Sequence, residues 1–436
     1  MAQSAMSVTP YWELTFDADG DADGHERDRL LAEIPQRGVH DLIVFAHGWN
    51  NDRSGATRLY SRYFAPIPGL APTARIGYVG VVWPSMRFSD EPIPDFPRSV
   101  AAELPPRPVL DKDTRHALLE TFPGRATVID QLTRLLDQQP GEQAELEEFG
   151  RLVRMLVDVV PPGPQALFTA DTLANGAPES EPEMFSHPAA ACEEFAQALA
   201  QLEAPGGEGF ALPNPWDGAH ELLRQATYFA MKRRAGTVGE RGLGRVVGQL
   251  AAAAPGVRVH LVGHSFGARL VSFALRGLPE GVHTVKSVTL LQGAFSHYAF
   301  AARLPHDARA SGVLHGQHKR IDGPLVCCYS HFDSSLGTIY PLASRMSGDD
   351  ASLAGFDLGR LLGAKWGAMG HDGVQAVDGT RSLKLADALR AKLPAAGCVN
   401  IDAAAVVNRG GPPAGAHSDI CHQELAQVVL AAGRIV

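Results

Sequence analysis

The chain has 436 residues, of which 45% are hydrophobic and 20% are charged, and its formal net charge is −9. This composition is typical of a globular protein that buries a large core, and it excludes a disordered or fibrous chain. Basic residues are scattered, with Lys232-Arg233-Arg234 as their longest run, so neither a nucleic acid nor an anionic membrane is expected as a partner.

The first block of the chain, residues 8–86, alternates short apolar runs with helical patterns. The expected elements are strands over 11–16, 41–47 and 78–84 and helices over 25–34 and 53–64. Strands that alternate with helices along a chain predict a parallel sheet.

Residues 87–214 differ in character from this first block. They begin and end in proline- and glycine-rich segments and contain helical patterns over 127–139 and 144–160, but no strand pattern. We expect a helical insertion here, so that residues 1–86 and 215–436 form the core. A lid that shapes a pocket and a packed decoration without effect on specificity are both open interpretations of this insertion.

The third block returns to alternating strands and helices. Its expected elements are a helical region over 217–254, a strand over 257–262, a helix over 266–277, strands over 285–293, 324–330 and 399–407, and a last helix over 423–432. The parallel sheet of the first block is therefore expected to continue here.

The pentapeptide Gly263-His264-Ser265-Phe266-Gly267 lies between an expected strand and an expected helix. A turn this sharp pushes the serine into a strained conformation with its hydroxyl projecting from the sheet, and it needs small residues at Gly263 and Gly267. The Phe266 N–H would begin the helix, where it can stabilise an oxyanion. The alternative is that two glycines simply make a tight turn.

The run VHLVGHSFGARLVSFAL resembles the nucleophile elbow and following helix of the α/β-hydrolase superfamily. Within this superfamily, the chain resembles a group of poorly characterised bacterial serine hydrolases in four segments: HGWNN, VVWPS, GHSFGAR and FDSSLGTIYPLASR. The resemblance covers the first and third blocks and implies an α/β-hydrolase fold, whose mostly parallel central sheet is flanked by helices. It does not cover residues 87–214, so the inserted helical cap is inferred only from the pattern and position of that segment. The resemblance also implies a catalytic triad in the chain order serine, acid, histidine.

Asp333 is the expected acid of such a triad. It follows the apolar strand over 324–330, where a parallel strand delivers its carboxyl-end loop. A plain turn-forming role is the alternative for an aspartate in this setting. The other carboxylates considered are less well placed along the chain; they are Asp322, Asp349, Asp350 and Asp402.

His417 is the expected base, because it lies in a glycine- and proline-rich loop between the last strand and the final helix. Imidazole, with an ordinary pKa of ~6.5, can take the serine proton and return it to the leaving group near neutral pH. His422, in the first turns of the final helix, and His371 are the fallback candidates.

The loop that follows the strand over 41–47 is the expected source of a second oxyanion donor. Gly48 follows His47, and in the superfamily the residue after this glycine donates its backbone N–H, which here is Trp49. A simple strand-ending turn through Gly48 is the alternative interpretation.

Together these residues predict a serine hydrolase that cleaves a carboxylic ester with an apolar acyl or alcohol part through an acyl-enzyme intermediate. A thioesterase or peptidase would use the same residues, and a non-catalytic binding protein on the same fold is the rival hypothesis. The expected partner is a small-molecule or lipid-like ester, and we expect no cofactor.

Other signals in the chain are weaker. Asp17 to Glu26 carries alternate aspartates, but neither register supplies both the glycine and the glutamate of a calcium loop, so a solvated acidic turn is expected and no metal site is predicted. The adjacent Cys327 and Cys328 are expected to pack on opposite faces of a strand. Five cysteines without a Cys-x-x-Cys pair and an N-terminus without a signal-peptide pattern favour the cytoplasm; export by another route and the oligomeric state stay open.

Overall fold

The computed structural model describes most of the chain. The described residues are 6–49, 51–86, 88, 110–157, 163–175, 177–178, 183–185, 187–203, 213–336, 367–411 and 415–435. Two of the aspartates considered as alternative acids, Asp349 and Asp350, lie outside the described residues.

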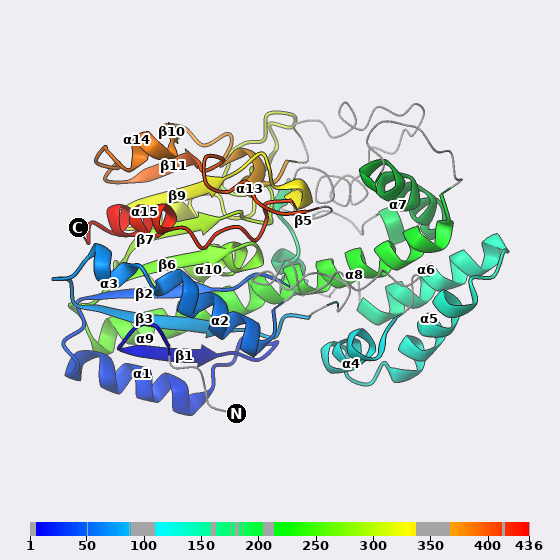
Figure 1. The fold of residues 1–436 in the computed structure, drawn as a ribbon, viewed down its shortest axis with the longest axis horizontal. Coiled ribbons are helices and arrows are strands. Elements are labelled where there is room, and N and C mark those ends of the chain that lie inside the picture. Colours follow the sequence, from blue (N-terminus) through cyan, green and yellow to red (C-terminus); the bar gives the residue numbers. More distant parts are fainter. Residues whose placement is uncertain are drawn as a thin grey trace.

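An eight-stranded sheet forms the centre of the protein, in the order β1-β3-β2-β6-β7-β9-β11-β10 (Figure 1). All neighbouring strands pair in parallel, which confirms the predicted parallel α/β sheet. The strands are β1 (Tyr11–Thr15), β2 (Asp41–Ala46), β3 (Ile76–Val82), β6 (Arg258–His264), β7 (Val285–Leu291), β9 (Pro324–Tyr329), β10 (Arg381–Lys384) and β11 (Gly397–Asp402).

Burial explains which strands were recognisable as apolar runs. Strands β2 and β3 are buried along their whole length, as expected for inner strands of a parallel sheet covered on both faces. Strand β10 at the edge has the polar sequence RSLK and is largely exposed, which is why no strand was predicted there. Cys327 and Cys328 are both fully buried and belong to the cores on opposite faces of the sheet, as predicted.

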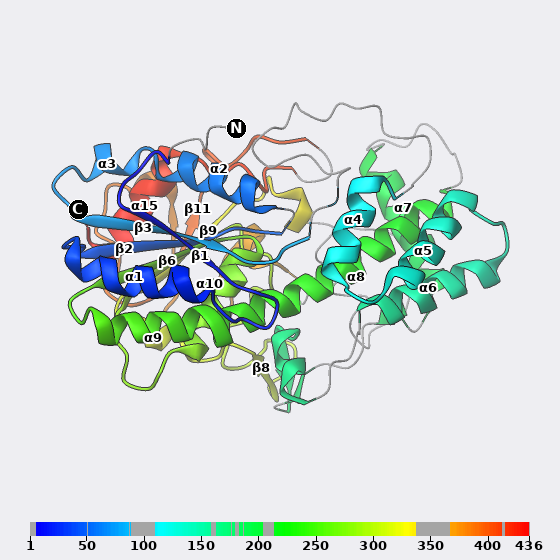
Figure 2. The ribbon, with the colours of Figure 1, turned by 90° about the horizontal axis from the view of Figure 1, so that it is seen from below.

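Helices cover both faces of the sheet, as the two views show (Figures 1 and 2). One face carries α1 (Gly24–Gln36), α9 (Gly244–Ala253) and α10 (Phe266–Gly277), and the other carries α2 (Arg53–Phe64), α3 (Ile67–Leu70) and α15 (Gln423–Gly433). Short helices α13 (Met369–Asp372) and α14 (Leu385–Ala388) complete the core. Successive side chains of a strand alternate between the two faces, so Leu42 and Val44 join one hydrophobic core and Ile43 and Phe45 the other.

The inserted segment is largely helical, as predicted, and its helices gather beyond one end of the sheet (Figure 1). They are α4 (Lys112–Thr121), α5 (Ala126–Gln138), α6 (Gln143–Val157) and α7 (Pro188–Glu203), with short 3₁₀ segments at Gly163–Phe168 and Glu183–Phe185. The long helix α8 (Pro215–Thr237) connects them to the core. Near its start Trp216 packs edge-on against Phe149 of α6, and further along Tyr228 contacts Phe266 of α10.

A π-helical segment, Val238–Leu243, joins α8 to α9 without a break, so the long helical region expected over 217–254 is confirmed, with one π-helical turn inside it.

A second small sheet corrects one expectation, namely that the insertion contains no strand. Strands β4 (Thr172–Ala174) and β5 (Ala177–Pro178) of the insertion pair antiparallel with each other, and β4 also pairs with β8 (Ala310–Gly312). These strands are too short to leave a pattern in the sequence, and the β4–β8 pairing joins residues far apart in the chain.

No helix among the described residues is both long enough and apolar enough to cross a membrane.

Candidate active site

Ser265 lies in the sharp turn between β6 and α10 and has a strained backbone, with φ 55° and ψ −120°. A positive φ is rare for a residue other than glycine, and such strain concentrates at functional sites. The turn depends on close approach at both glycines. A side chain at Gly263 would overlap the backbone of Gly267, and one at Gly267 would overlap the backbone of Ala46 at the end of β2.

The structure brings Ser265, His417 and Asp333 together in one hydrogen-bonded chain. The Ser265 Oγ lies 2.9 Å from His417 Nε2, and His417 Nδ1 lies 2.7 Å from Asp333 Oδ2. Because a carboxylate accepts the Nδ1 hydrogen, the Nε2 of neutral His417 is left to accept the serine hydrogen. Three residues from distant parts of the sequence thus have the mutual orientation that nucleophilic catalysis by a serine requires.

Two loops at the carboxyl edge of the sheet hold this chain in place. Asp333 follows β9, is fully buried, and accepts a second hydrogen bond from the Leu336 N–H at 3.0 Å. The turn that carries His417 is tied to the Asp333 loop by a hydrogen bond of 2.9 Å from the Ala416 N–H to the Phe332 carbonyl. The His417 side chain is 16% exposed, so His417 is reachable from solvent whereas Asp333 is not.

His264, next to Ser265, holds the backbone of His417 from the other side. Its Nε2 donates to the backbone carbonyl of His417 at 2.8 Å, and the two imidazole rings lie 5.1 Å apart. Burial, reinforced by the neighbouring His417, lowers the pKa of His264 to about 3. His264 is therefore neutral at physiological pH and acts as a fixed hydrogen-bond donor.

The loop after β2 lies against Ser265. The Gly48 carbonyl accepts from His47 Nδ1 at 2.8 Å, and the Asn51 side chain donates to the Trp49 carbonyl at 3.1 Å. Since the carbonyl and N–H of a trans peptide point in opposite directions, the Trp49 N–H faces away from the His47 ring. Burial lowers the pKa of His47 to about 4, so this ring is also neutral and keeps the loop in one hydrogen-bonding state.

The other expected donor is the N–H of Phe266, the first residue of α10. The first N–H groups of a helix have no partner within the helix, and the helix dipole makes this end electropositive. Trp49 and Phe266 thus place their N–H groups on the two segments that flank Ser265. Their role as oxyanion donors stays a prediction.

Aromatic side chains gather beside Ser265 on the side of α8 and α10. The centre of the Tyr228 ring lies 4.6 Å from that of Phe266 and 5.9 Å from that of Trp49. The ring centres of Trp49 and Phe88 are 6.1 Å apart. These rings come from the core, from α8 and from the segment that enters the insertion. They form an apolar wall packed around Phe266, the residue that follows Ser265.

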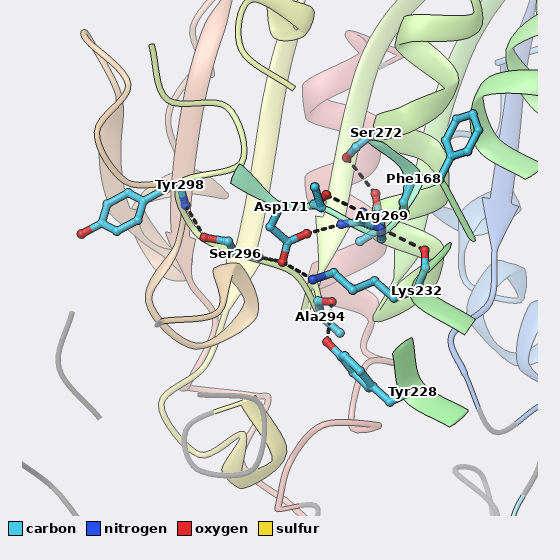
Figure 3. Close-up of polar contacts among 11 residues, drawn as sticks. Phe168, Asp171, Tyr228, Lys232, Arg269, Ser272, Ala294, Ser296 and Tyr298 are labelled. Atoms are coloured by element: carbon cyan, nitrogen blue, oxygen red, sulfur yellow. Dashed lines mark hydrogen bonds and ion pairs between the residues drawn. The ribbon is translucent and has the colours of Figure 1, made fainter. Parts of the chain in front are cut away.

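A buried ion cluster lies next to this wall and joins the insertion to the core (Figure 3). Asp171, just before β4, pairs with Arg269 of α10 and, at 2.9 Å, with Lys232 of α8. Arg269 is fully buried and also donates to the carbonyls of Phe168, Ala170 and Lys232. Sequence reasoning missed this cluster; its one signal was a charged residue inside the apolar pattern of the helix that follows Ser265.

The fallback histidines lie elsewhere in the hydrogen-bond network. His422 Nε2 bonds Asp419 Oδ1 at 2.8 Å, and Asp419 in turn accepts from the backbone of Asn408 and Arg409. His371 belongs to α13, and neither side chain has a hydrogen bond to Ser265 among the described residues. Of the three histidines considered, His417 is the one that contacts the serine.

The described alternatives for the acid are engaged in other interactions. Asp322 forms an ion pair with Lys286, and Asp402 accepts from the Ala404 N–H at 3.0 Å. Neither contacts His417, whereas Asp333 does. The choice made from chain order therefore coincides with the carboxylate found beside His417.

Two further polar groupings were missed by sequence reasoning. At the amino edge of the sheet, Ser287 Oγ lies 2.9 Å from His260 Nδ1, and His260 Nε2 lies 2.9 Å from Asp41 Oδ1. This second serine–histidine–aspartate chain is entirely buried within regular strands, and its serine is not among the residues with a positive φ. Near the carboxyl edge, His297 Nδ1 bonds the Asp372 carboxylate at 2.8 Å.

Metal ligands are not clustered in the part of the chain that the structure describes, where no group of three His, Cys, Asp or Glu side chains could hold an ion. The Asp17 carboxylate accepts hydrogen bonds from the Asp19 and Asp21 N–H groups at 3.0 and 2.9 Å. The alternate aspartates thus form a self-bonded acidic turn, as predicted.

Comparison of the chain with protein-family models, with curated proteins and with solved structures finds no match in any of the three.

Proposed function

We propose that the protein is a serine hydrolase of the α/β-hydrolase type that cleaves a carboxylic ester through an acyl-enzyme intermediate. The observation that carries this proposal is the hydrogen-bonded chain from Ser265 through His417 to Asp333, built on a serine with a φ of 55°. Strain and a paired imidazole on the same serine are what nucleophilic catalysis needs, and packing alone needs neither.

The proposed reaction begins when Ser265 Oγ attacks the ester carbonyl carbon and its proton passes to His417 Nε2. Asp333 accepts the Nδ1 hydrogen, holds the ring in place and stabilises the imidazolium. The negative charge that develops on the carbonyl oxygen is held by the N–H groups of Phe266 and Trp49. His417 then gives its proton to the leaving alkoxide, which departs as an alcohol.

In the second half of the reaction, water attacks the acyl group bound to Ser265. His417 takes a proton from this water, and the acid is released as the serine recovers its proton. The aromatic wall of Trp49, Tyr228 and Phe266 supports a substrate with an apolar part beside the scissile bond. The proposal places this activity on a small-molecule or lipid-like ester in the cytoplasm, consistent with five free thiols.

Labelling with a fluorophosphonate probe tests the proposal. The wild-type protein is expected to take up one label on Ser265, and Ser265→Ala is expected to take up none. Ser287→Ala is the matched control, because it removes the serine of the other serine–histidine–aspartate chain and should leave labelling intact. A folded wild-type protein that takes up no label would contradict the proposal and favour a non-catalytic binding protein on the same fold.

A further inference from the structure

Gln292 lies directly beside Ser265 at the carboxyl edge of the sheet. His264 is paired in register with Leu291 of β7, so the next residues along the two strands are Ser265 and Gln292. The Ser265 N–H bonds the Leu291 carbonyl at 3.0 Å, and the Ala294 N–H bonds the Ser265 carbonyl at 3.2 Å. These two hydrogen bonds bracket Gln292 and fix its backbone next to the proposed nucleophile.

The backbone of Gln292 is strained in the same way as that of Ser265. Its φ is 43°, a region that side-chain-bearing residues rarely occupy. The surrounding structure enforces this conformation: the Gln292 N–H bonds the Cys328 carbonyl at 3.1 Å, and Gly370 lies so close that a side chain there would overlap the Gln292 backbone. Backbone strain of this kind persists at sites where position matters for function.

The Gln292 side chain is fully buried, yet neither its oxygen nor its nitrogen has a hydrogen-bond partner in the described structure. Burying an amide without partners is costly, and nearly all buried polar atoms in folded proteins have one. Methionine or leucine would fill the same space without that cost. An unpaired buried amide next to a nucleophile is therefore expected to have its partner in the bound substrate.

Resting on the proposed function, we propose that Gln292 is a substrate-recognition residue that binds an amide group in the acyl part of the ester. A glutamine side chain offers an N–H donor and a carbonyl acceptor in one plane, and an amide presents the complementary pair. The acyl part is the portion that stays attached to Ser265 in the intermediate, so it is the portion beside Gln292. The substrate class is an ester of an N-acylated amino acid or a related amide-bearing acid.

Two p-nitrophenyl esters with acyl chains of equal length test this role: the N-acetylglycinate, which carries an amide, and the pentanoate, which does not. A site built to hydrogen-bond a substrate group discriminates strongly against an analogue that lacks it. Gln292→Met is expected to lower the ratio of kcat/KM for the N-acetylglycinate to that for the pentanoate by at least about tenfold. Comparing the ratio between two proteins cancels the different intrinsic reactivities of the esters.

Gln225→Met is the matched control, because Gln225 is also buried but its amide bonds Glu221 at 2.6 Å. This control should lower thermal stability and leave the ester ratio unchanged. Gln292→Met should not lower stability, since the amide it removes has no partner in the described structure. Loss of stability in Gln292→Met, or an unchanged ester ratio, would overturn the proposal and indicate a structural glutamine bonded to buried water.

Labelling rates separate the two proposals. An alkyl fluorophosphonate and a fluorophosphonate that carries an acetamidomethyl group should both label Ser265. In Gln292→Met, the labelling rate of the acetamidomethyl probe should fall more than that of the alkyl probe. Equal losses for both probes, with Ser265 still labelled, would overturn the role of Gln292 alone. Absence of labelling by either probe would contradict the serine hydrolase itself, and the role of Gln292 with it.

Discussion

The α-carbon of Gly48 lies so close to Ser265 that a methyl group placed on it would approach the Ser265 Cβ to 2.7 Å. The same methyl group would lie 3.1 Å from His264 Nδ1. The loop after β2 is thus fitted against the elbow with no space for any side chain, and this contact sets the distance between the proposed nucleophile and the loop that carries the Trp49 N–H.

Gly48→Ala should therefore impair the site without unfolding the protein. Because the loop must move away from Ser265, the rate of fluorophosphonate labelling is expected to fall about tenfold to a hundredfold, since small displacements of catalytic groups have large effects on rate. Gly69→Ala is the control: Gly69 lies in α3 with nothing within 4 Å of the added methyl group. Equal labelling of the two variants would show that the loop contributes nothing to the reaction.

The two histidines near the C-terminus should differ sharply in their importance. His417→Ala removes the partner of the Ser265 hydroxyl and is expected to lower ester turnover at least about a thousandfold. His422→Ala removes only the bond to Asp419, so a loss of less than about tenfold is expected. Steady-state turnover of an activated ester measures both, and the reverse ranking would place the base at His422.

The buried histidines around Ser265 should make the fold sensitive to acid. Burial lowers the pKa of His47 to about 4 and that of His264 to about 3, below the ordinary value of about 6.5 that they regain on unfolding. Between these values the unfolded chain binds more protons than the folded one, so the free energy of unfolding is highest above about pH 6.5 and falls as the pH falls.

Each of these two imidazoles contributes a slope of up to about 1.4 kcal/mol per pH unit in the window between its folded and unfolded pKa. Urea unfolding at several pH values from about 4.5 to about 7.5 would measure the slope, because this range covers most of the window between the folded and unfolded pKa values. His264→Gln keeps a donor for the His417 carbonyl but does not titrate, so it should flatten the slope. An unchanged slope in this variant would show that folding does not lower the pKa of His264.

Removing one partner from the ion cluster between the insertion and the core should be strongly destabilising, because it leaves a buried charge undercompensated. Arg269→Met leaves the Asp171 carboxylate with one fewer cation in a buried site and is expected to lower the free energy of unfolding by about 3–5 kcal/mol. Arg309→Met is the control, because Arg309 pairs with Asp307 at the surface, where a change within about 0.5 kcal/mol is expected. Chemical denaturation of both variants measures the change in the free energy of unfolding. Similar losses in the two variants would show that the buried ion pair contributes no more to stability than the surface pair.

The site could be predicted from the sequence to the extent that its parts are local. The strand, the glycine-flanked turn and the helix around Ser265 lie within one short run of the sequence. They can be recognised there because alternating apolar residues, flanking glycines and helical spacing of apolar residues are all local patterns. Chain order and position after a strand were enough to select Asp333 over Asp322 and His417 over His422, and the structure brings the selected residues together.

Groups that depend on distant residues escaped prediction. Nothing near Arg269 in the sequence indicates that Asp171 lies beside it, since the two are brought together only by packing of the insertion on α10. The short β4 and β8 strands pair across the same junction and were missed for the same reason. In the sequence, nothing distinguishes Gln292 from an ordinary residue at the end of a strand. Its burial and its unpaired amide are properties of the folded structure.

The sequence by itself determined the alternation of strands and helices, the elbow at Ser265 and the order of the residues that could serve it, because these follow from local periodicity and from backbone constraints at glycine. Only the tertiary structure revealed the second serine–histidine–aspartate chain, whose serine, unlike Ser265, is not among the described residues with a positive φ. Both chains contain the same three residue types. Their difference arises from register, burial and backbone conformation, which exist only once the sheet has formed.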